Sequence, residues 1–196
     1  MKTDEKIALA LGGAVALVGG AWWWSEEQGE GLFDMVTDFL SLLTTSEAER
    51  MEKLEPETQS RLRDLIFALG ADGIRVYVGQ TLRTAAQEKA LIEAGRTSAT
   101  LKHSWHELGR AVDLYPIDPD TGKPDLKGRR VDLFQAMHAK AAELGFRGIA
   151  FQADGVTKRY ITNAKGKPVW DGGHLECRGP YETMAQAWAA EGPSVA

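Results

Sequence analysis

The chain has 196 residues, 43% hydrophobic and 26% charged, which is enough for one folded domain with a sizeable core and additional segments. The first 45 residues hold seven acidic residues and two lysines, so they account for the whole net charge of −5 and the remainder is balanced. The net charge of the remainder shows no overall excess of basic residues, so no nucleic-acid partner is expected. Cys177 is the only cysteine, which excludes an intrachain disulfide.

The N-terminal segment predicts a membrane anchor. Residues 7–24 are uncharged and almost wholly apolar, and their length is near the lower limit for a helix that spans a bilayer. Lys2 and Lys6 precede them and only acidic residues follow at once, so residues 1–6 are expected in the cytoplasm. The rest of the chain is then a single-pass protein's periplasmic or otherwise extracytoplasmic part. A cleaved signal peptide and a buried core helix are the alternatives.

A second apolar pattern follows the anchor. Residues 32–43 place apolar side chains at helical spacing with polar and acidic side chains opposite, which predicts a short amphipathic helix. This helix could pack on the bilayer, on the folded domain or on another copy of the chain, so self-association is one expectation. Residues 44–53 are polar and are predicted to be a linker. Residues 25–53 are therefore assigned as juxtamembrane helix and linker, and residues 54–196 as the folded domain.

The folded domain mixes helices with short strands. Pro56 suits the first turn of a helix, Thr84 with Gln87 forms a capping box, and Gly95 suits a helix end. The patterns predict helices over 56–69, 84–94, 131–144 and 180–190, strands over 74–78, 110–115, 149–151, 159–162 and 169–176, and a turn-rich loop over 118–128. Strands and helices do not alternate regularly, which favours an α+β fold with a small antiparallel sheet flanked by helices.

The stretch SWHELGRAVDLYP, residues 104–116, combines a histidine, a glycine and an aspartate. Gly109 allows the chain to turn between His106 and the strand that follows. Ala111 and Asp113 point to the same face of that strand, and the small Ala111 leaves room for His106 to meet Asp113. The pair is suited to bind zinc, although a histidine before a strand is also commonly just hydrogen-bonded.

A catalytic zinc site needs a third protein ligand and a base for its water. His174 is the best third ligand, because it lies in a glycine-flanked strand that could pair beside the first. Asp171 precedes it by three residues, and the two glycines between them let the carboxylate bend toward the metal, so Asp171 is the expected base. Glu176 shares the strand face of His174 and could hold that histidine from behind or act as an alternative base.

Together these motifs resemble those of the zinc D-Ala-D-Ala carboxypeptidase family, which includes VanY-type and VanX-type peptidases and phage endolysins that cleave between L-Ala and D-Glu. Residues 104–113 match the family signature SxHxxGxAxD at all five positions, and DGGHLE at 171–176 resembles the second family motif. TLRTAAQ at 81–87 resembles the family's arginine-containing segment, and Gly95-Arg96-Thr97 resembles a loop of the endolysin branch. The resemblance covers residues 54–188.

The resemblance implies a role for each residue. His106, Asp113 and His174 would bind Zn²⁺, and Asp171 would be the general base. Arg83 would steady the carbonyl oxygen or a carboxylate of the substrate; a surface arginine at a helix start is the alternative. Ser104 would hydrogen-bond substrate or a ligand, or else cap the local turn.

The remaining histidines and the cysteine are expected outside the metal site. His103 is the main rival ligand but precedes His106 by three residues and is expected at the rim or exposed. His138 falls on a predicted helix and is expected to be structural or exposed. Cys177 is expected to be a small buried residue.

The sequence therefore predicts a membrane-anchored zinc metallopeptidase acting on peptidoglycan stem peptides, with the lipid bilayer as a second partner through residues 7–24. The Gly95–Thr97 resemblance favours an L-Ala–D-Glu endopeptidase of the endolysin type. Such an enzyme could be a phage lysis protein, a virion-associated protein or a bacterial enzyme that remodels the wall. The alternatives are a D-Ala-D-Ala carboxypeptidase in wall remodelling and a non-catalytic wall-binding or virion structural protein.

Overall fold

The computed structural model describes residues 45–95, 97, 104–163 and 165–191, which form an α+β domain. The predicted anchor at 7–24, the amphipathic segment at 32–43 and His103 lie outside the described residues. Among the helices of the described ranges, none is both long enough and apolar enough to cross a bilayer.

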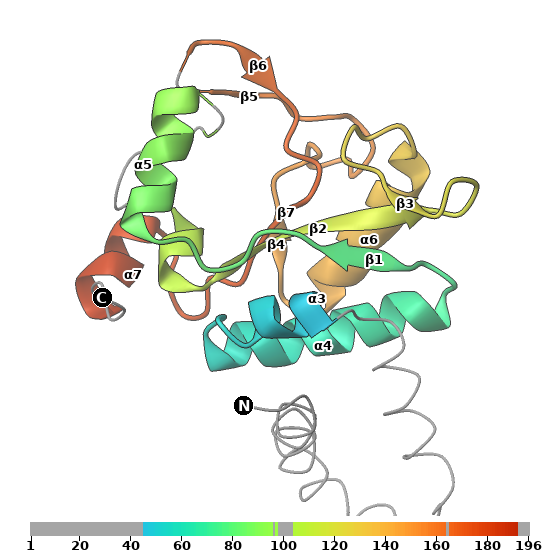
Figure 1. Cartoon of the computed structure of the whole chain (residues 1–196), viewed down its shortest axis with the longest axis horizontal. Coiled ribbons are helices and arrows are strands. Elements are labelled where there is room, and N and C mark those ends of the chain that lie inside the picture. The colour runs from blue at the N-terminus through green and yellow to red at the C-terminus, as the bar shows by residue number, and fades with distance from the viewer. Residues whose placement is uncertain (1–44, 96, 98–103, 164, 192–196) are drawn as a thin grey trace, which may run out of the picture. The chain divides into compact units, whose positions relative to one another are not determined.

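The sheet at the centre of the domain is antiparallel throughout, as predicted. Its strands run in the order β1-β2-β7-β4, and β3 pairs with the end of β2 (Figure 1). A separate hairpin is made by β5 and β6. The strands are β1 (Val76–Val78), β2 (Ala111–Asp118), β3 (Lys123–Pro124), β4 (Arg147–Gly148), β5 (Ile161–Thr162), β6 (Pro168–Val169) and β7 (His174–Glu176).

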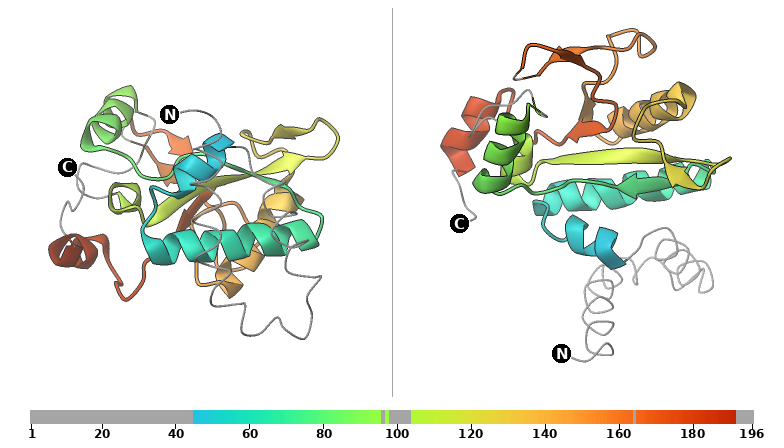
Figure 2. Two further views of the ribbon diagram at one scale, coloured as in Figure 1. Left: turned by 60° about the horizontal axis from the view of Figure 1, so that its bottom comes forward. Right: turned by 45° about the horizontal axis from the view of Figure 1, so that its top comes forward.

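Helices flank this sheet, with α4 running beneath it and α6 behind it in Figure 1, and Figure 2 shows the same layers from two other sides. The helix α6 contacts β2, β4 and α4. At one end of the domain, α7 contacts the short 3-10 helix η1. The helices are α3 (Thr45–Met51), α4 (Pro56–Ala71), α5 (Ala85–Ala94), η1 (Trp105–Leu108), α6 (Val131–Glu143) and α7 (Met184–Glu191).

The core is built from one apolar stripe of each long helix and the inner face of the sheet. In α4 the fully buried residues recur at helical spacing, and in α6 Phe134 and Met137 are equally buried. Side chains alternate along a strand, so Val112 and Leu114 of β2 share one face while Asp113 points to the other. All three are buried. The alternation therefore fills the core from one face of β2 and leaves the opposite face for a polar site.

The segment predicted to be a linker is instead a helix that packs on the domain. Helix α3 contacts β1, and its Glu47 and Met51 side chains are buried. The Glu47 carboxylate accepts a hydrogen bond from the Val78 backbone N–H at 2.9 Å. An edge strand needs partners for its outward N–H groups. Residues 44–53 look like a linker because they are polar and acidic, but one of these acidic residues, Glu47, is the hydrogen-bond partner of the edge strand β1.

Two other boundaries also differ from the sequence patterns. The last helix begins at Met184 instead of Pro180, because Thr183 and Gln186 form its capping hydrogen bonds. The strand predicted over 169–176 is split into β6 and β7, which belong to different sheets. The predicted strand at 149–151 corresponds to β4, which lies two residues earlier.

Helix α7 is held near the site by both apolar and charged contacts. Trp105, Leu108 and Ala187 belong to one buried cluster that joins η1 to α7. The Arg110 guanidinium donates two hydrogen bonds to the Glu191 carboxylate, at 2.9 and 2.6 Å. Helix α7 therefore supports the turn that carries His106.

Candidate metal centre

Strand pairing places two of the three predicted ligands opposite each other. In the β2–β7 ladder Asp113 faces His174 directly. Directly opposed residues in an antiparallel pair have side chains close together on the same face. The Leu114 N–H donates to the Gly173 carbonyl at 2.9 Å, which extends the pairing just beyond the ladder. The sheet register alone therefore brings a carboxylate beside an imidazole.

The third ligand reaches the pair through a tight turn. His106 lies in η1, and the chain reverses at Gly109, whose φ of 66° is in the left-handed region that suits glycine. A Cβ at Gly109 would also lie 3.0 Å from the Glu55 backbone nitrogen. The His106 side chain is fully buried. This confirms the turn that the sequence predicted at Gly109 and the approach of His106 to Asp113.

The three donor atoms form a nearly equilateral triangle. The distances are 3.2 Å from His106 Nε2 to His174 Nδ1, 3.2 Å from His106 Nε2 to Asp113 Oδ1, and 3.3 Å from His174 Nδ1 to Asp113 Oδ1. A tetrahedral zinc with bonds of about 2.0–2.1 Å holds its ligand atoms about 3.3–3.4 Å apart. The triangle therefore fits zinc in both size and donor type, and the three residues form a group that could hold a metal ion.

Each ligand is also held from behind by a second group. His106 Nδ1 lies 2.7 Å from the Thr81 carbonyl oxygen, which can only accept, so Nδ1 carries the hydrogen and Nε2 presents its lone pair. His174 Nε2 donates to Glu176 Oε1 at 3.3 Å, which leaves Nδ1 for the metal. Such partners fix the tautomer and orientation of a ligand. Glu176 thus takes the supporting place that the sequence offered as one of its two roles.

The electrostatics of the triad favour one negative charge and one shared proton in the absence of metal. Burial alone would raise the pKa of the Asp113 carboxyl, but the charges and hydrogen bonds of His106 and His174 hold it well below its usual range. Burial would lower the pKa of His174, but its hydrogen bonds to Asp113 and Glu176 raise it to about 10. A divalent cation would have to displace that proton.

The predicted base lies beside the triad. Burial raises the pKa of Asp171, while the neighbouring His174, His106 and Arg83 side chains oppose that rise. A general base works best when its pKa is moved toward the working pH, so the direction suits the role. Glu176 differs: burial would raise its pKa, but His174 and Arg178 hold it below the ordinary value. Of the two carboxylates, Asp171 therefore has the pKa shift expected of a base.

Two glycines let the Asp171 segment pass close to β2. A Cβ at Gly173 would lie 2.8 Å from the Tyr115 ring and 2.9 Å from the Leu114 carbonyl oxygen. A Cβ at Gly172 would lie 2.5 Å from the Trp170 ring. A side chain at Gly173 would force the backbone away from β2, whereas one at Gly172 would displace the Trp170 ring. Gly173 is therefore needed for the close approach to β2, and Gly172 for the packing of Trp170 beside it.

Arg83 contacts a ligand directly. Its Nη2 donates to Asp113 Oδ2 at 3.0 Å, its Nη1 to Glu88 Oε2 at 3.3 Å and its Nε to Gln80 Oε1 at 2.6 Å. Oδ2 is the Asp113 oxygen that does not face the two histidines, so Arg83 orients this carboxylate. The sequence motif placed Arg83 near the reaction but did not indicate this contact.

A cavity of about 440 Å³ lies on another side of Arg83. It is bounded by the end of α3, the β1–α5 connection and α5, and Gln80 and Gln87 line it with Arg83. A guanidinium has five N–H groups, and three of those of Arg83 are used by the bonds above. The others have no acceptor among the described residues. Arg83 can therefore orient Asp113 and still donate to a bound molecule.

The other predicted residues have clear places. Ser104 is buried, and its side chain does not cap η1, so the predicted turn-capping role is not observed. His138 is not part of the triad: its Nε2 lies 2.8 Å from the Gly172 carbonyl oxygen, and burial lowers its pKa. The neutral ring donates to that carbonyl and steadies the segment before His174. Cys177 is fully buried, as expected.

Sequence reasoning missed Thr81 and Glu88, which orient His106 and Arg83. Thr81 acts through its backbone carbonyl, which no side-chain motif indicates. Glu88 is fully buried on α5, although the chain places alanines and a lysine around it. A fully buried carboxylate normally requires a cationic partner, here Arg83, but the burial of Glu88 appears only in the structure.

No protein-family model and no curated protein matches the chain. Among solved structures, the chain is similar to the L-Ala D-Glu endopeptidase ChiX of Serratia marcescens, with 17% identity and a TM-score of 0.49, over 68% of this chain and 87% of that one. It is similar to a zinc-bound mutant of the vancomycin resistance D,D-pentapeptidase VanY, with 18% identity and a TM-score of 0.46, over 69% of this chain and 78% of that one. It is also similar to VanYB in complex with D-alanine-D-alanine, with 18% identity and a TM-score of 0.45, over 68% of this chain and 74% of that one.

Proposed function

We propose that the chain is a zinc-dependent peptidase that hydrolyses stem peptides of peptidoglycan. The observation that carries the proposal is the triangle of His106, Asp113 and His174 donor atoms at zinc-ligand spacing, with the Asp171 carboxyl beside it. Two histidines, one carboxylate and an adjacent base form the set required for metal-assisted hydrolysis. The resemblance of the motifs at 81–87, 104–113 and 171–176 to the carboxypeptidase family supplies the substrate class.

The chemistry divides between the metal and two side chains, those of Asp171 and Arg83. Zinc, when bound, would supply Lewis-acid activation of water and of the scissile carbonyl. Asp171 accepts the proton of the attacking water and delivers it to the leaving amine, which its raised pKa favours. Arg83 keeps Asp113 in place through Oδ2 and offers its remaining N–H groups to the carbonyl oxygen or a substrate carboxylate.

Within this class we propose cleavage between L-Ala and D-Glu. The support is the resemblance of Gly95-Arg96-Thr97 to the endolysin-type loop. Gly95 ends α5 in the left-handed conformation that suits glycine. Cleavage of D-Ala-D-Ala is the competing activity within the same site.

One digestion experiment tests both levels of the proposal. The full-length, zinc-loaded protein is incubated with purified peptidoglycan, and the new peptide termini are identified by mass spectrometry. A new N-terminal D-Glu is expected, and free D-Ala would assign the carboxypeptidase activity instead. His174→Ala removes a ligand and is expected to abolish cleavage, and chelation followed by zinc addition is expected to restore it in the wild type only. No cleavage by the zinc-loaded wild type would refute the peptidase function.

We also propose that residues 7–24 anchor the protein with the peptidase domain outside the cytoplasm. The support is the apolar segment itself, with lysines before it and acidic residues after it. In cells, the expected result is a membrane-bound protein whose C-terminal domain is digested by protease added to spheroplasts. Recovery of the full-length chain in the soluble fraction would contradict the anchor.

A further inference from the structure

One exposed segment carries a charge unlike the rest of the domain. The hairpin made by β5 and β6, with its flanks, spans residues 158–169 and is called the basic hairpin below. Residues 155–170 hold four basic residues and no acidic one, whereas the folded part of the chain is balanced overall. The basic residues are Lys158, Arg159, Lys165 and Lys167.

The charges of the basic hairpin are not neutralised within the described residues. Arg159, Lys165 and Lys167 are exposed, and within the described ranges none of them forms an ion pair with a carboxylate. Lys158 differs, because its ammonium lies 4.0 Å from the centre of the Trp170 ring and donates to the Gly128 carbonyl. Three cations of the hairpin are therefore available to an anionic partner, and Lys158 fixes the base of the hairpin.

Apolar side chains lie among these cations. Tyr160 is 61% exposed and Val169 is 39% exposed, and they are two of the few large apolar side chains of the described residues that face solvent. Tyrosine is common at binding surfaces because one end of its ring is apolar and the other forms hydrogen bonds. A cationic surface with an exposed tyrosine suits a partner that carries both carboxylates and apolar groups.

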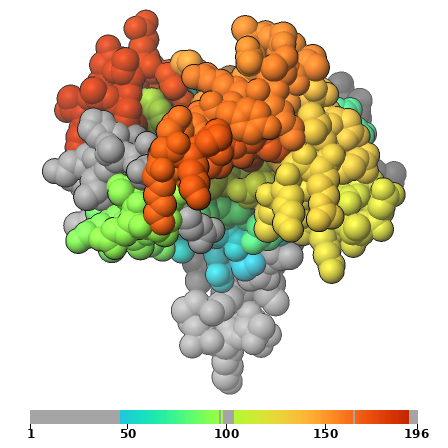
Figure 3. All heavy atoms as spheres, turned by 90° about the horizontal axis from the view of Figure 1, so that it is seen from above, coloured from blue at the N-terminus to red at the C-terminus, as the bar shows by residue number. Residues whose placement is uncertain are grey.

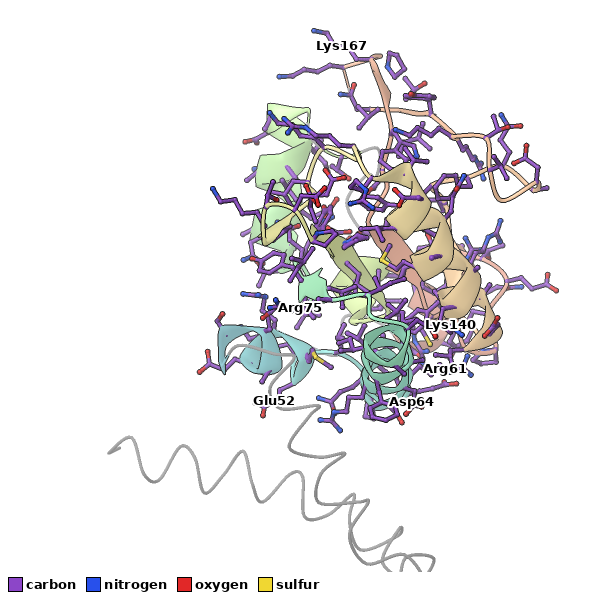
Figure 4. The ribbon with its side chains drawn as sticks, turned by 90° about the vertical axis from the view of Figure 1, so that its right-hand side faces the viewer. Glu52, Arg61, Asp64, Arg75, Lys140 and Lys167 are labelled. Atoms are coloured by element: carbon purple, nitrogen blue, oxygen red, sulfur yellow. The ribbon has the colours of Figure 1, made fainter. Side chains whose placement is uncertain are left out.

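The basic hairpin also borders the metal centre. Its second strand continues through Trp170 into Asp171, and the Trp170 indole donates to the Ala150 carbonyl at 2.7 Å. The other part of the hairpin contacts α5, where Asn163 donates to the Gly95 carbonyl at 2.8 Å and the Lys165 stem lies over Gly95. Figure 3 shows the hairpin atoms next to α5. Lys167 lies at the end of the molecule farthest from α4 (Figure 4).

We propose that the basic hairpin is a docking surface for peptidoglycan, and that it binds the acidic stem peptides next to the one that enters the metal centre. This inference rests on the proposed function, because stem peptides that contain glutamate carry free carboxylates. The hairpin is joined to Asp171 through Trp170, so it lies next to the place that the cleaved stem would occupy. Charges at the rim of a site mainly change association and its salt dependence, so the hairpin raises activity on the polymer and leaves the chemistry unchanged.

The binding experiment uses full-length His174→Ala protein, which cannot cut what it binds, and purified insoluble peptidoglycan freed of other anionic wall polymers. Combining Arg159→Glu with Lys167→Glu is expected to weaken sedimentation with the wall by about tenfold or more at low salt, because both charges are exposed. The matched control combines Arg75→Glu with Lys123→Glu, two exposed cations elsewhere on the domain, and is expected to bind like the parent. Arg75 lies far from Lys167 in Figure 4.

The activity experiment separates this inference from the proposed function. In the otherwise wild-type chain, the Arg159→Glu and Lys167→Glu pair is expected to lower the rate on insoluble wall by about tenfold and to leave kcat/KM on a soluble stem peptide unchanged. Equal losses on both substrates, or unchanged binding in sedimentation, would overturn the docking role. Binding that requires teichoic acid or anionic lipid vesicles would assign the hairpin to another partner. If the wild type cuts neither substrate, the proposed function fails, while the sedimentation result still tests the hairpin.

Discussion

The metal centre and the basic hairpin are joined through a single residue, Trp170, yet they are built in opposite ways. In the metal centre, the side chains of His106 and Asp113 are buried and each ligand has a second partner that fixes its orientation. In the hairpin, Arg159 and Lys167 are exposed, and neither has a carboxylate partner among the described residues. The difference indicates that the fold fixes the donor atoms of the triad and leaves the charged side chains of the hairpin without fixed partners.

A replacement of the base should give the largest effect on activity. Asp171→Asn keeps the size of the side chain but cannot accept a proton, so kcat is expected to fall by about 10²–10⁴-fold. Zinc content, measured by atomic absorption, should stay at the wild-type level because Asp171 is not a ligand. Asp132→Asn, at an exposed carboxylate on α6, is the control and should leave kcat unchanged. A kcat for Asp171→Asn close to that of the wild type would transfer the base role to Glu176.

Loss of the group behind His174 should weaken metal binding more than it changes the fold. Glu176→Ala removes the acceptor for His174 Nε2, and such losses typically reduce metal affinity by about 10–100-fold. Glu176→Gln keeps an acceptor oxygen and should lose less affinity. Competition with a chromophoric chelator measures both variants. If both bind zinc like the wild type, Glu176 does not position His174.

Zinc binding should release protons in proportion to the protonation of His174. In the metal-free protein the pKa of His174 is raised to about 10, so at neutral pH the metal must displace about one proton. Apparent affinity should then rise by up to about tenfold per pH unit and level off as pH passes the His174 pKa. The same raised pKa stabilises the metal-free fold below the unfolded-state pKa, and this contribution is lost as pH rises toward 10. Calorimetry in buffers of different ionisation enthalpy measures the proton count, and a count of zero would contradict the shared proton.

The smallest effect is expected in the hairpin. Lys167→Ala should change the free energy of unfolding by no more than about 0.5 kcal/mol, because its side chain is exposed and makes no ion pair within the described residues. Leu175→Ala, at the fully buried neighbour of His174, should cost about 2–5 kcal/mol. Urea unfolding of both variants compares the two regions directly. A large loss for Lys167→Ala would show that the hairpin supports the fold and is not only a surface.

Sequence patterns predict most of the elements of the fold and all three members of the triad. Local signals were sufficient where they are strong, as in the Thr84–Gln87 capping box, which the structure contains with both hydrogen bonds. They were insufficient where the partner is distant in sequence. Glu47 is buried on α3, where it accepts from Val78, and the two-residue strand β4 lies two residues before the strand that the pattern predicts. The hydrogen bond between His106 Nδ1 and the Thr81 carbonyl joins residues that are distant in sequence, so no local pattern indicates it.

The β2–β7 register has a consequence for how preparations of the protein should be judged. Sliding β7 by one residue would place Gly173 or Leu175 opposite Asp113 and turn every side chain of β7 to the other face. A chain paired in that way could keep its helices and still lack one donor atom of the triangle. The molar ratio of tightly held zinc to protein therefore counts the chains that have paired correctly. Far-ultraviolet circular dichroism would not separate the two populations, so metal stoichiometry is the better measure of native folding.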